Sequence, residues 1–339
     1  MRKKMFLKYI IFALCSFLIV ICIGCVGMAA SAEEYYSIGM AFFDLGKFED
    51  AEKWLNRARQ ADRTYVASQY NLGRLAFERQ RFDEAARHFE GILRRDPDNV
   101  LALRAAAYTR IRLGNIDIAQ RHYSRLLQLV PESADDGYNH ALVLFAMEFF
   151  AEAEEVLERY PVSLLENKDM QLLFARSQAA QNKVEAINTY ANFLEHFPDP
   201  KARFEYAAVL EHHEFYVKAL EEFHAALAEL TPTTTDLSRH EVIFSIARVL
   251  LIADSESSEG ITELQSIIDD GFNDITAVEK LAENTKISSA NIERLRAMIT
   301  NMRRMAVVVE EPQQETFIDD DDMENIDSTL ETDPESSSY

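Results

Sequence analysis

The apolar and polar positions of the chain follow one pattern that returns every 34 residues between about residues 32 and 131. Ala51, Ala85 and Ala119 are 34 residues apart, and an apolar residue stands three positions before and four positions after each of them. These flanking apolar residues are Phe48, Leu55, Phe82, Phe89, Ile116 and Tyr123. A fixed period of this length is typical of repeat architectures, in which each unit buries its apolar face against the next unit.

Each period contains two apolar-periodic segments of about 13 residues, which predict two helices joined by a tight turn. The three turns are expected at residues 44–47, 78–81 and 113–115. Gly46 and Gly114 suit the position after a helix end, where the backbone adopts a left-handed conformation. Pro97 and Pro131 follow the second helices, which they cannot continue. The sequence therefore predicts a stack of helix hairpins.

Small residues recur twelve positions before each repeated alanine, where they allow the two helices of a pair to approach closely. Together with the alanines, the flanking aromatic residues and the prolines, these positions resemble the pattern of tetratricopeptide repeat proteins. The chain departs from that pattern at the fourth position of each unit, where the family often has tryptophan. The small residues are Gly39, Gly73 and Ala107, and the fourth positions hold Tyr35, Gln69 and Leu103.

The resemblance implies an all-α fold, a right-handed α-solenoid of six to seven helix hairpins. The period continues more loosely through Ala153, Ala186 and Ala219, and a degenerate seventh unit is expected at residues 236–268. A short helix at residues 275–283 and an amphipathic helix around Leu295 are expected to cap the stack. We therefore expect the repeats at residues 33–270, capping helices at 271–305 and a disordered acidic tail at 306–339.

Charge is distributed unevenly over a chain whose net charge is −22. The first three repeats hold 16 basic and 14 acidic residues, whereas residues 306–339 hold 12 acidic residues and no basic residue. Nucleic-acid binding needs a basic stripe that neutralises phosphates, so this acidity argues against a nucleic-acid partner. A local basic groove within the first three repeats remains compatible with the sequence. The acidic tail is interpreted as a solvating segment or as a short motif that docks on a basic surface.

The N-terminus carries basic residues at positions 2–4, followed by 22 uncharged residues at 9–30. Three interpretations stay open for residues 1–32. Cleavage after Ala32 gives an exported body that starts at Glu33, since Ala30-Ser31-Ala32 fits a signal-peptide site. Lipidation at Cys25 fits a loose lipoprotein pattern, and an uncut segment of this length can span a bilayer. All three place the body on the outer, periplasmic or cell-envelope side of the inner membrane.

No catalytic or metal-binding pattern appears in the sequence, so we expect neither enzyme activity nor a cofactor or metal site. All three cysteines lie in the N-terminal apolar segment. The adjacent His212 and His213 point about 100° apart on a helix and do not form an i, i+4 pair of ligands. Binding of a small ligand or a metal by the repeats is a less favoured alternative.

In the family that the chain resembles, the first helix of each hairpin lines a concave groove that binds peptides. Carrying the groove positions of the family onto this sequence predicts a surface of aromatic, arginine and amide side chains, which are common anchors in protein interfaces. The predicted groove residues are Tyr36, Tyr70, Asn71, Arg74, Phe77, Arg104, Tyr108, Arg112, Tyr138, Asn139 and Phe145. Part of the aromatic set is also compatible with packing between helices.

We therefore expect a non-enzymatic scaffold or adaptor that binds a peptide or protein partner in the groove of repeats one to four. The N-terminal segment is expected to associate this scaffold with a membrane. The alternative is a lipoprotein that acts in the assembly of outer-membrane or secretion machinery. Lipidation of Cys25 would favour this alternative.

Overall fold

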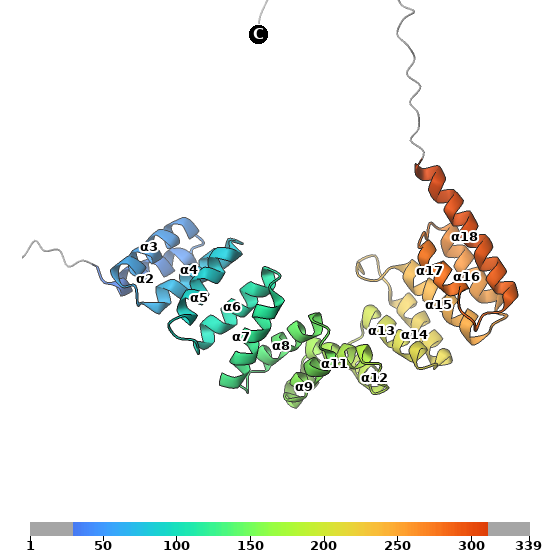
Figure 1. The fold of residues 1–339 in the computed structure, drawn as a ribbon, viewed down its shortest axis with the longest axis horizontal. Coiled ribbons are helices and arrows are strands. Elements are labelled where there is room, and N and C mark those ends of the chain that lie inside the picture. The colour runs from blue at the N-terminus through green and yellow to red at the C-terminus, as the bar shows by residue number, and fades with distance from the viewer. Residues whose placement is uncertain (1–29, 311–339) are drawn as a thin grey trace, which may run out of the picture. The chain divides into compact units, whose positions relative to one another are not determined.

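The computed structural model describes residues 30–310, with side chains described for residues 30–306. Within this range every regular element is a helix, and the chain divides into two compact units after Glu229 (Figure 1). The predicted N-terminal segment, including Cys25, and the acidic tail from residue 311 onward lie outside the described residues. In the part of the chain that the structure describes, no helix is both long and apolar enough to cross a membrane.

The first unit consists of six helix hairpins and one short additional helix, α10. Its helices are α2 (Ala32–Asp44), α3 (Phe48–Ala61), α4 (Val66–Glu78), α5 (Phe82–Leu93), α6 (Val100–Arg112), α7 (Ile116–Leu129), α8 (Ala134–Ala146), α9 (Phe150–Glu158), α10 (Pro161–Glu166), α11 (Lys168–Ala180), α12 (Ala186–His196), α13 (Pro200–His212) and α14 (Tyr216–Glu229). In each hairpin the first helix packs against the second. The predicted all-α solenoid of helix hairpins is confirmed.

The second unit contains one further hairpin and the two capping helices. Its helices are α15 (Arg239–Ala253), α16 (Ser258–Asp269), α17 (Ile275–Ala282) and α18 (Ser289–Glu310). Leu295, Met298 and Met302 bury one side of α18, as the spacing of its apolar residues predicts. Helix α18 packs against α17 and also contacts α16, the second helix of the last hairpin.

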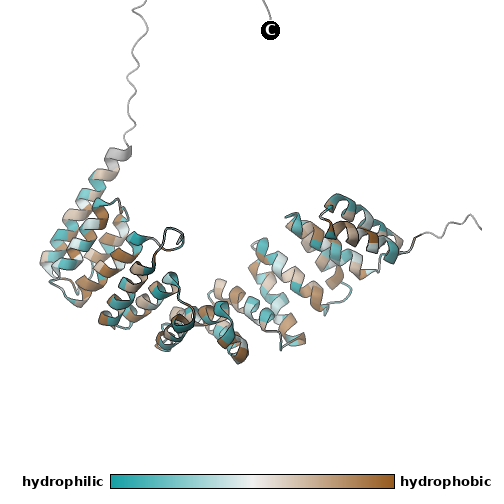
Figure 2. Cartoon of the chain, turned by 180° about the vertical axis from the view of Figure 1, so that it is seen from behind, coloured by the Kyte–Doolittle hydropathy of each residue, from teal (hydrophilic) through white to brown (hydrophobic). Residues whose placement is uncertain are grey.

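The repeated positions form the core between the helices of each hairpin. Ala51, Ala85 and Ala119 are fully buried. A β-carbon at Gly73 would lie 2.6 Å from the ring of Phe89, so only glycine permits this helix approach without movement of the ring. Figure 2 shows polar and apolar residues intermixed along the helices, consistent with helices that each bury one side.

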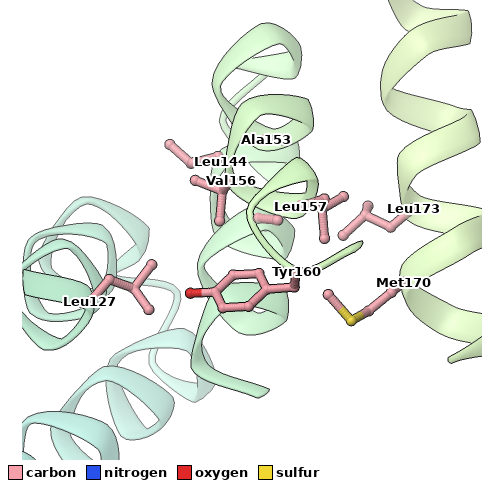
Figure 3. Packing of buried hydrophobic residues seen from close by; sticks show 9 residues of the cluster. Leu127, Leu144, Ala153, Val156, Leu157, Tyr160, Met170 and Leu173 are labelled. Atoms are coloured by element: carbon pink, nitrogen blue, oxygen red, sulfur yellow. The ribbon is translucent and has the colours of Figure 1, made fainter. Parts of the chain in front are cut away.

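The fourth hairpin differs from the first three because α10 follows its second helix and interrupts the period. Tyr160 immediately precedes Pro161, which occupies the first turn of α10. The ring of Tyr160 packs in a cluster with Leu127 and Met170, and its hydroxyl donates to the carbonyl of Pro131 at 2.9 Å (Figure 3). The sequence pattern did not predict α10.

All six hairpins of the first unit turn through one left-handed residue. Gly46 and Gly114 have φ values of 69° and 72°, as their positions predict. The equivalent residues of the other four hairpins are not glycines; they are Gln80, Glu148, Asn182 and Glu214, with φ between 57° and 64°. The left-handed conformation costs a non-glycine residue about 1–2 kcal/mol, so packing of the hairpins must impose it.

Candidate functional site

The predicted groove residues lie on the first helices of four successive hairpins, α2, α4, α6 and α8. Helix α4 contacts both α2 and α6, and α8 contacts α11, so neighbouring first helices adjoin one another. We call the surface that these helices form the first-helix face. The structure therefore brings the predicted residues onto this face, although their contact with a partner stays a prediction.

The first cluster on this face centres on Arg74. Asn71 is buried, donates its amide to the hydroxyl of Tyr36 at 3.1 Å and accepts a hydrogen bond from Arg74 at 3.0 Å. The guanidinium of Arg74 lies 5.0 Å from the centre of the Phe43 ring. The amide of Asn71 is thus occupied by its own chain and positions Arg74, whose side chain remains exposed.

The second cluster centres on Arg112. Its guanidinium lies 4.7 Å from the ring centre of Phe82 and 5.9 Å from that of Phe77. Phe77 in turn contacts Tyr108, with 5.3 Å between the ring centres. Tyr108 is 47% exposed, which is high for an aromatic residue. This cluster offers a cation and an exposed aromatic surface together, an arrangement common at protein interfaces.

Arg104 has a different environment from these two arginines. Its guanidinium donates two hydrogen bonds, of 2.7 and 2.6 Å, to the carboxylate of Asp136, which is fully buried. Burial alone would raise the pKa of Asp136, but hydrogen bonds from Arg104 and Ser133 outweigh it and hold that pKa below its usual value. Arg104 therefore joins α6 to α8, and its charge is already compensated.

The remaining predicted residues are half-buried. Tyr70 packs against the core cluster around Phe89, and Tyr138 and Phe145 pack against the cluster around Tyr160. The amide of Asn139 donates to the carbonyl of Asp135 at 2.8 Å, within its own helix. These aromatic side chains serve the packing between helices and are partly exposed.

The first-helix face continues into a hollow of about 460 Å³ that sequence reasoning did not identify. Residues of α8, α11 and α13 line this hollow, including Phe145 and Arg176. Arg176 donates two hydrogen bonds of 2.8 Å to Glu205, whose carboxylate also accepts one from Tyr190 at 3.1 Å. His212 also lines the hollow, so the histidine pair that the sequence set aside lies beside it.

The two pairs join adjacent hairpins at a separation of about one repeat. Arg104 and Asp136 are 32 residues apart, and Arg176 and Glu205 are 29 apart. This spacing alone does not identify such pairs, because Glu78 and Arg112 are 34 residues apart and form no ion pair within the described residues.

Metal ligands do not gather on this face. Among residues 30–306, no group of three or more His, Cys, Asp and Glu side chains is placed to hold an ion. The rings of His212 and His213 meet edge to face, with their centres 5.2 Å apart.

Comparison with known proteins identifies the repeat. The sequence model of the tetratricopeptide repeat family matches residues 42–107 and 76–136. A protein described as an uncharacterized lipoprotein of Treponema pallidum (strain Nichols) is 24% identical over 142 residues, which span 42% of this chain and 72% of that protein.

Two solved structures are similar at low identity. A tetratricopeptide repeat protein from Parabacteroides merdae ATCC 43184 is 20% identical, with a TM-score of 0.49; the match covers 75% of this chain and 99% of that one. YrrB, described as a TPR protein with an unusual peptide-binding site, is 20% identical, with a TM-score of 0.47; the match covers 51% and 91%.

Proposed function

The chain is a tetratricopeptide repeat protein, and from this premise we propose that it is a non-enzymatic scaffold that binds a peptide or protein on the first-helix face. The observation that carries the proposal is the pair of exposed cation–aromatic clusters at Arg74 and Arg112. The first cluster lies on α2 and α4 and the second on α4, α5 and α6, so the two clusters are neighbours in the stack.

The chemistry of the two clusters defines the kind of partner. Arg74 and Arg112 each carry a charge that no carboxylate neutralises in the described part of the chain. The exposed ring of Tyr108, which contacts Phe77 of the second cluster, gains from contact with an apolar side chain. A partner segment that carries both a carboxylate and an apolar or aromatic side chain satisfies both requirements.

Site-specific photo-crosslinking of the full chain in its native membrane tests this proposal. A crosslinker at Tyr108 is expected to capture the partner, whereas one at Arg121, which is exposed on the second helix α7, is not. Arg74→Glu combined with Arg112→Glu should reduce capture about tenfold or more, because both anchors then repel a carboxylate. Arg121→Glu reverses one exposed charge outside the first-helix face and serves as the control for each single substitution. Unchanged capture by the double variant would refute the proposal.

We further propose that the chain is held at the cell envelope by its N-terminus, with lipidation at Cys25 as the favoured form. The relative described as a lipoprotein supports this choice. The structure adds a physical argument, since Ser31 caps α2. Its hydroxyl accepts from the Glu34 amide at 3.1 Å, and the Glu34 carboxylate accepts from the Ser31 amide at 2.8 Å. Cleavage after Ala32 would remove this capping box, which stabilises a helix by about 1 kcal/mol.

Mass spectrometry of the mature N-terminus distinguishes the three forms. An acylated Cys25 at the first position supports the assembly-lipoprotein alternative, in which the scaffold serves outer-membrane or secretion machinery. A mature chain that begins at Glu33 would exclude both the lipid and the membrane-spanning forms. Cys25→Ser should abolish the acylated form, which the same mass measurement detects.

A further inference from the structure

A second concavity, of about 780 Å³, lies on α3 and α5, the second helices of the first two hairpins. Five arginines line it together with a single carboxylate, that of Glu84. This surface does not belong to the first-helix face, and we call it the arginine hollow. Such a concentration of positive charge is unexpected in a chain with a net charge of −22.

The arginines come from two helices and the residues that follow them. Arg59 lies in the last turn of α3, and Arg63 lies in the loop after it. Arg87 lies on α5, and Arg94 follows the end of α5 with a helical backbone, so these two lie on one side of that helix. Gly91 stands between the α5 arginines and leaves the middle of the row without a side chain. The two rows therefore flank a depression.

The floor of the hollow depends on this glycine. A β-carbon at Gly91 would lie 2.3 Å from the side-chain nitrogen of Gln69. That nitrogen donates to the carbonyl of His88 at 2.9 Å. Arg95 reaches across from the other side and donates to the carbonyl of Arg63 at 2.7 Å. Fixed hydrogen bonds thus shape the hollow beneath the charged groups.

The positive charge of the hollow is not compensated. The ion pairs within residues 30–306 include none between these five arginines and a carboxylate. Glu84, the acidic residue of the lining, pairs with Arg81 at 3.0 Å. Burial, followed by the nearby charge of Arg59, lowers the pKa of His88 at the edge of the hollow. A shaped, uncompensated cluster of guanidinium groups is suited to bind an anion.

We propose that the arginine hollow binds the phosphate group of an anionic lipid headgroup at the membrane surface. Arginine forks match phosphate oxygens in pairs, and basic residues near an anionic bilayer are attracted to it. Helix α2 begins two residues after the uncharged segment at residues 9–30, so the two hairpins that form the hollow are the first to follow the membrane-directed N-terminus. This inference rests on the proposed attachment of the chain to the envelope.

The shape of the hollow favours a compact anion over an acidic peptide. Its arginines come from α3, α5 and the segments that follow these two helices, so the charges converge on one depression. An extended acidic peptide would be bound better by positive charges that are spread along several hairpins. The acidic segment at residues 319–322 is the peptide that the chain itself would offer, and the experiment tests it as a competitor.

Hydrogen exchange of the full chain in vesicles tests the proposal. The chain is reconstituted in phosphatidylcholine vesicles, alone or with phosphatidylglycerol, and the amides of α3 and α5 are followed. Phosphatidylglycerol should slow their exchange about fivefold, because bound headgroups oppose local opening. Arg59→Gln combined with Arg87→Gln should abolish the effect. Arg121→Gln removes one exposed arginine of α7 and should retain it.

Additional arms identify the source of the anion. Inorganic phosphate added to phosphatidylcholine vesicles should protect these amides much less than the lipid does, and equal protection would overturn the lipid assignment. Protection in phosphatidylcholine alone that disappears when residues 307–339 are deleted would assign the hollow to the acidic tail and also overturn it. If phosphatidylglycerol slows exchange equally in the natural chain and in the variant with Arg59→Gln and Arg87→Gln, lipid does not bind in the arginine hollow.

A failure of the proposed N-terminal anchor can be distinguished from a failure of the proposed lipid site. If the chain does not remain with phosphatidylcholine vesicles on flotation, phosphatidylglycerol vesicles are added to the released chain. Co-flotation that the Arg59→Gln, Arg87→Gln variant loses supports the hollow as a lipid site, and absence of co-flotation refutes it. Partner capture at Tyr108 reports on the first-helix face in either case.

Discussion

Arginines occur in two contrasting settings in the first unit. Arg104 and Arg176 each make two hydrogen bonds to a carboxylate on the next hairpin, whereas the five arginines of the arginine hollow face solvent without a carboxylate partner in the described chain. The same side chain therefore joins hairpins in one region and leaves a positive potential in the other. Sequence spacing does not decide between the two roles, because Glu90 and Asp96 lie 31 and 33 residues after Arg59 and Arg63 without pairing with them. What decides is whether the folded chain brings a carboxylate against the guanidinium group.

The largest expected effect comes from breaking a compensated pair. Arg104→Leu leaves the carboxylate of Asp136 buried without its partner, which should lower the free energy of unfolding by about 3–5 kcal/mol. Urea denaturation followed by circular dichroism measures the loss, and hydrogen exchange in α6 and α8 shows where it occurs. The double variant Arg104→Leu, Asp136→Leu should recover much of the stability. A loss below about 1 kcal/mol in Arg104→Leu would contradict the structural role of this pair.

The contrast between buried and exposed charged groups extends to the histidines. For His140, burial affects the pKa more than neighbouring charges do. This residue is buried, stacks on Tyr123, and contacts the hydroxyl of Ser124 at 3.3 Å. Burial, with a smaller contribution from Arg159, lowers its pKa from 6.5 to about 4. The folded state therefore favours the neutral form of the His140 imidazole. The stability that this provides is complete above pH 6.5 and is lost as the pH falls towards 4.

Acid titration measures this contribution. Between pH 7 and pH 5 the free energy of unfolding should fall by about 2 kcal/mol more in the natural chain than in His140→Phe, which keeps an aromatic ring but cannot be protonated. His88 and His122, whose pKa values are also lowered, remain in both proteins and cancel in the difference. Parallel pH profiles for the two proteins would disprove the assignment.

The smallest effect on stability is expected in the arginine hollow. Arg59→Gln removes a charge without a carboxylate partner, so the free energy of unfolding should change by no more than about 0.5 kcal/mol. The same substitution should raise the pKa of His88, since Arg59 helps to lower it. An NMR titration of the His88 ring follows this shift, with Arg121→Gln as a control for net charge. An unchanged His88 pKa would mean that the charge of Arg59 is screened.

Much of the fold follows from the sequence, because it depends on local spacing. A fully buried Ala51 and a buried Leu55 four residues later are direct consequences of helical periodicity, and so are the turns at Gly46 and Gly114. Helix α10 was not predictable from the repeat, since it is short and lies where the period is interrupted. Short elements depend on tertiary contacts, here those of Tyr160, more than on their own pattern.

The candidate site was less accessible to sequence reasoning. Position in the repeat placed Arg74, Arg104 and Arg112 correctly on first helices, but it did not reveal that Arg104 is bound by Asp136 or that Asn71 is used within the chain. Such pairings depend on how the side chains of neighbouring hairpins contact one another. The sequence pattern of a single repeat does not contain this information. The arginine hollow was missed for the same reason, because its residues come from two different hairpins.

The recurring left-handed turn has a practical consequence for labelling the protein. A side chain added at Gly46 or Gly114 would meet no atom within 4 Å, and Gln80 and Glu148 already place polar side chains at the equivalent turns. A fluorophore attached through a cysteine at residue 80 or 148 would therefore stand clear of both helices of its hairpin. Energy transfer between these two dyes would track the distance between the second and fourth hairpins while each binding surface remains chemically untouched.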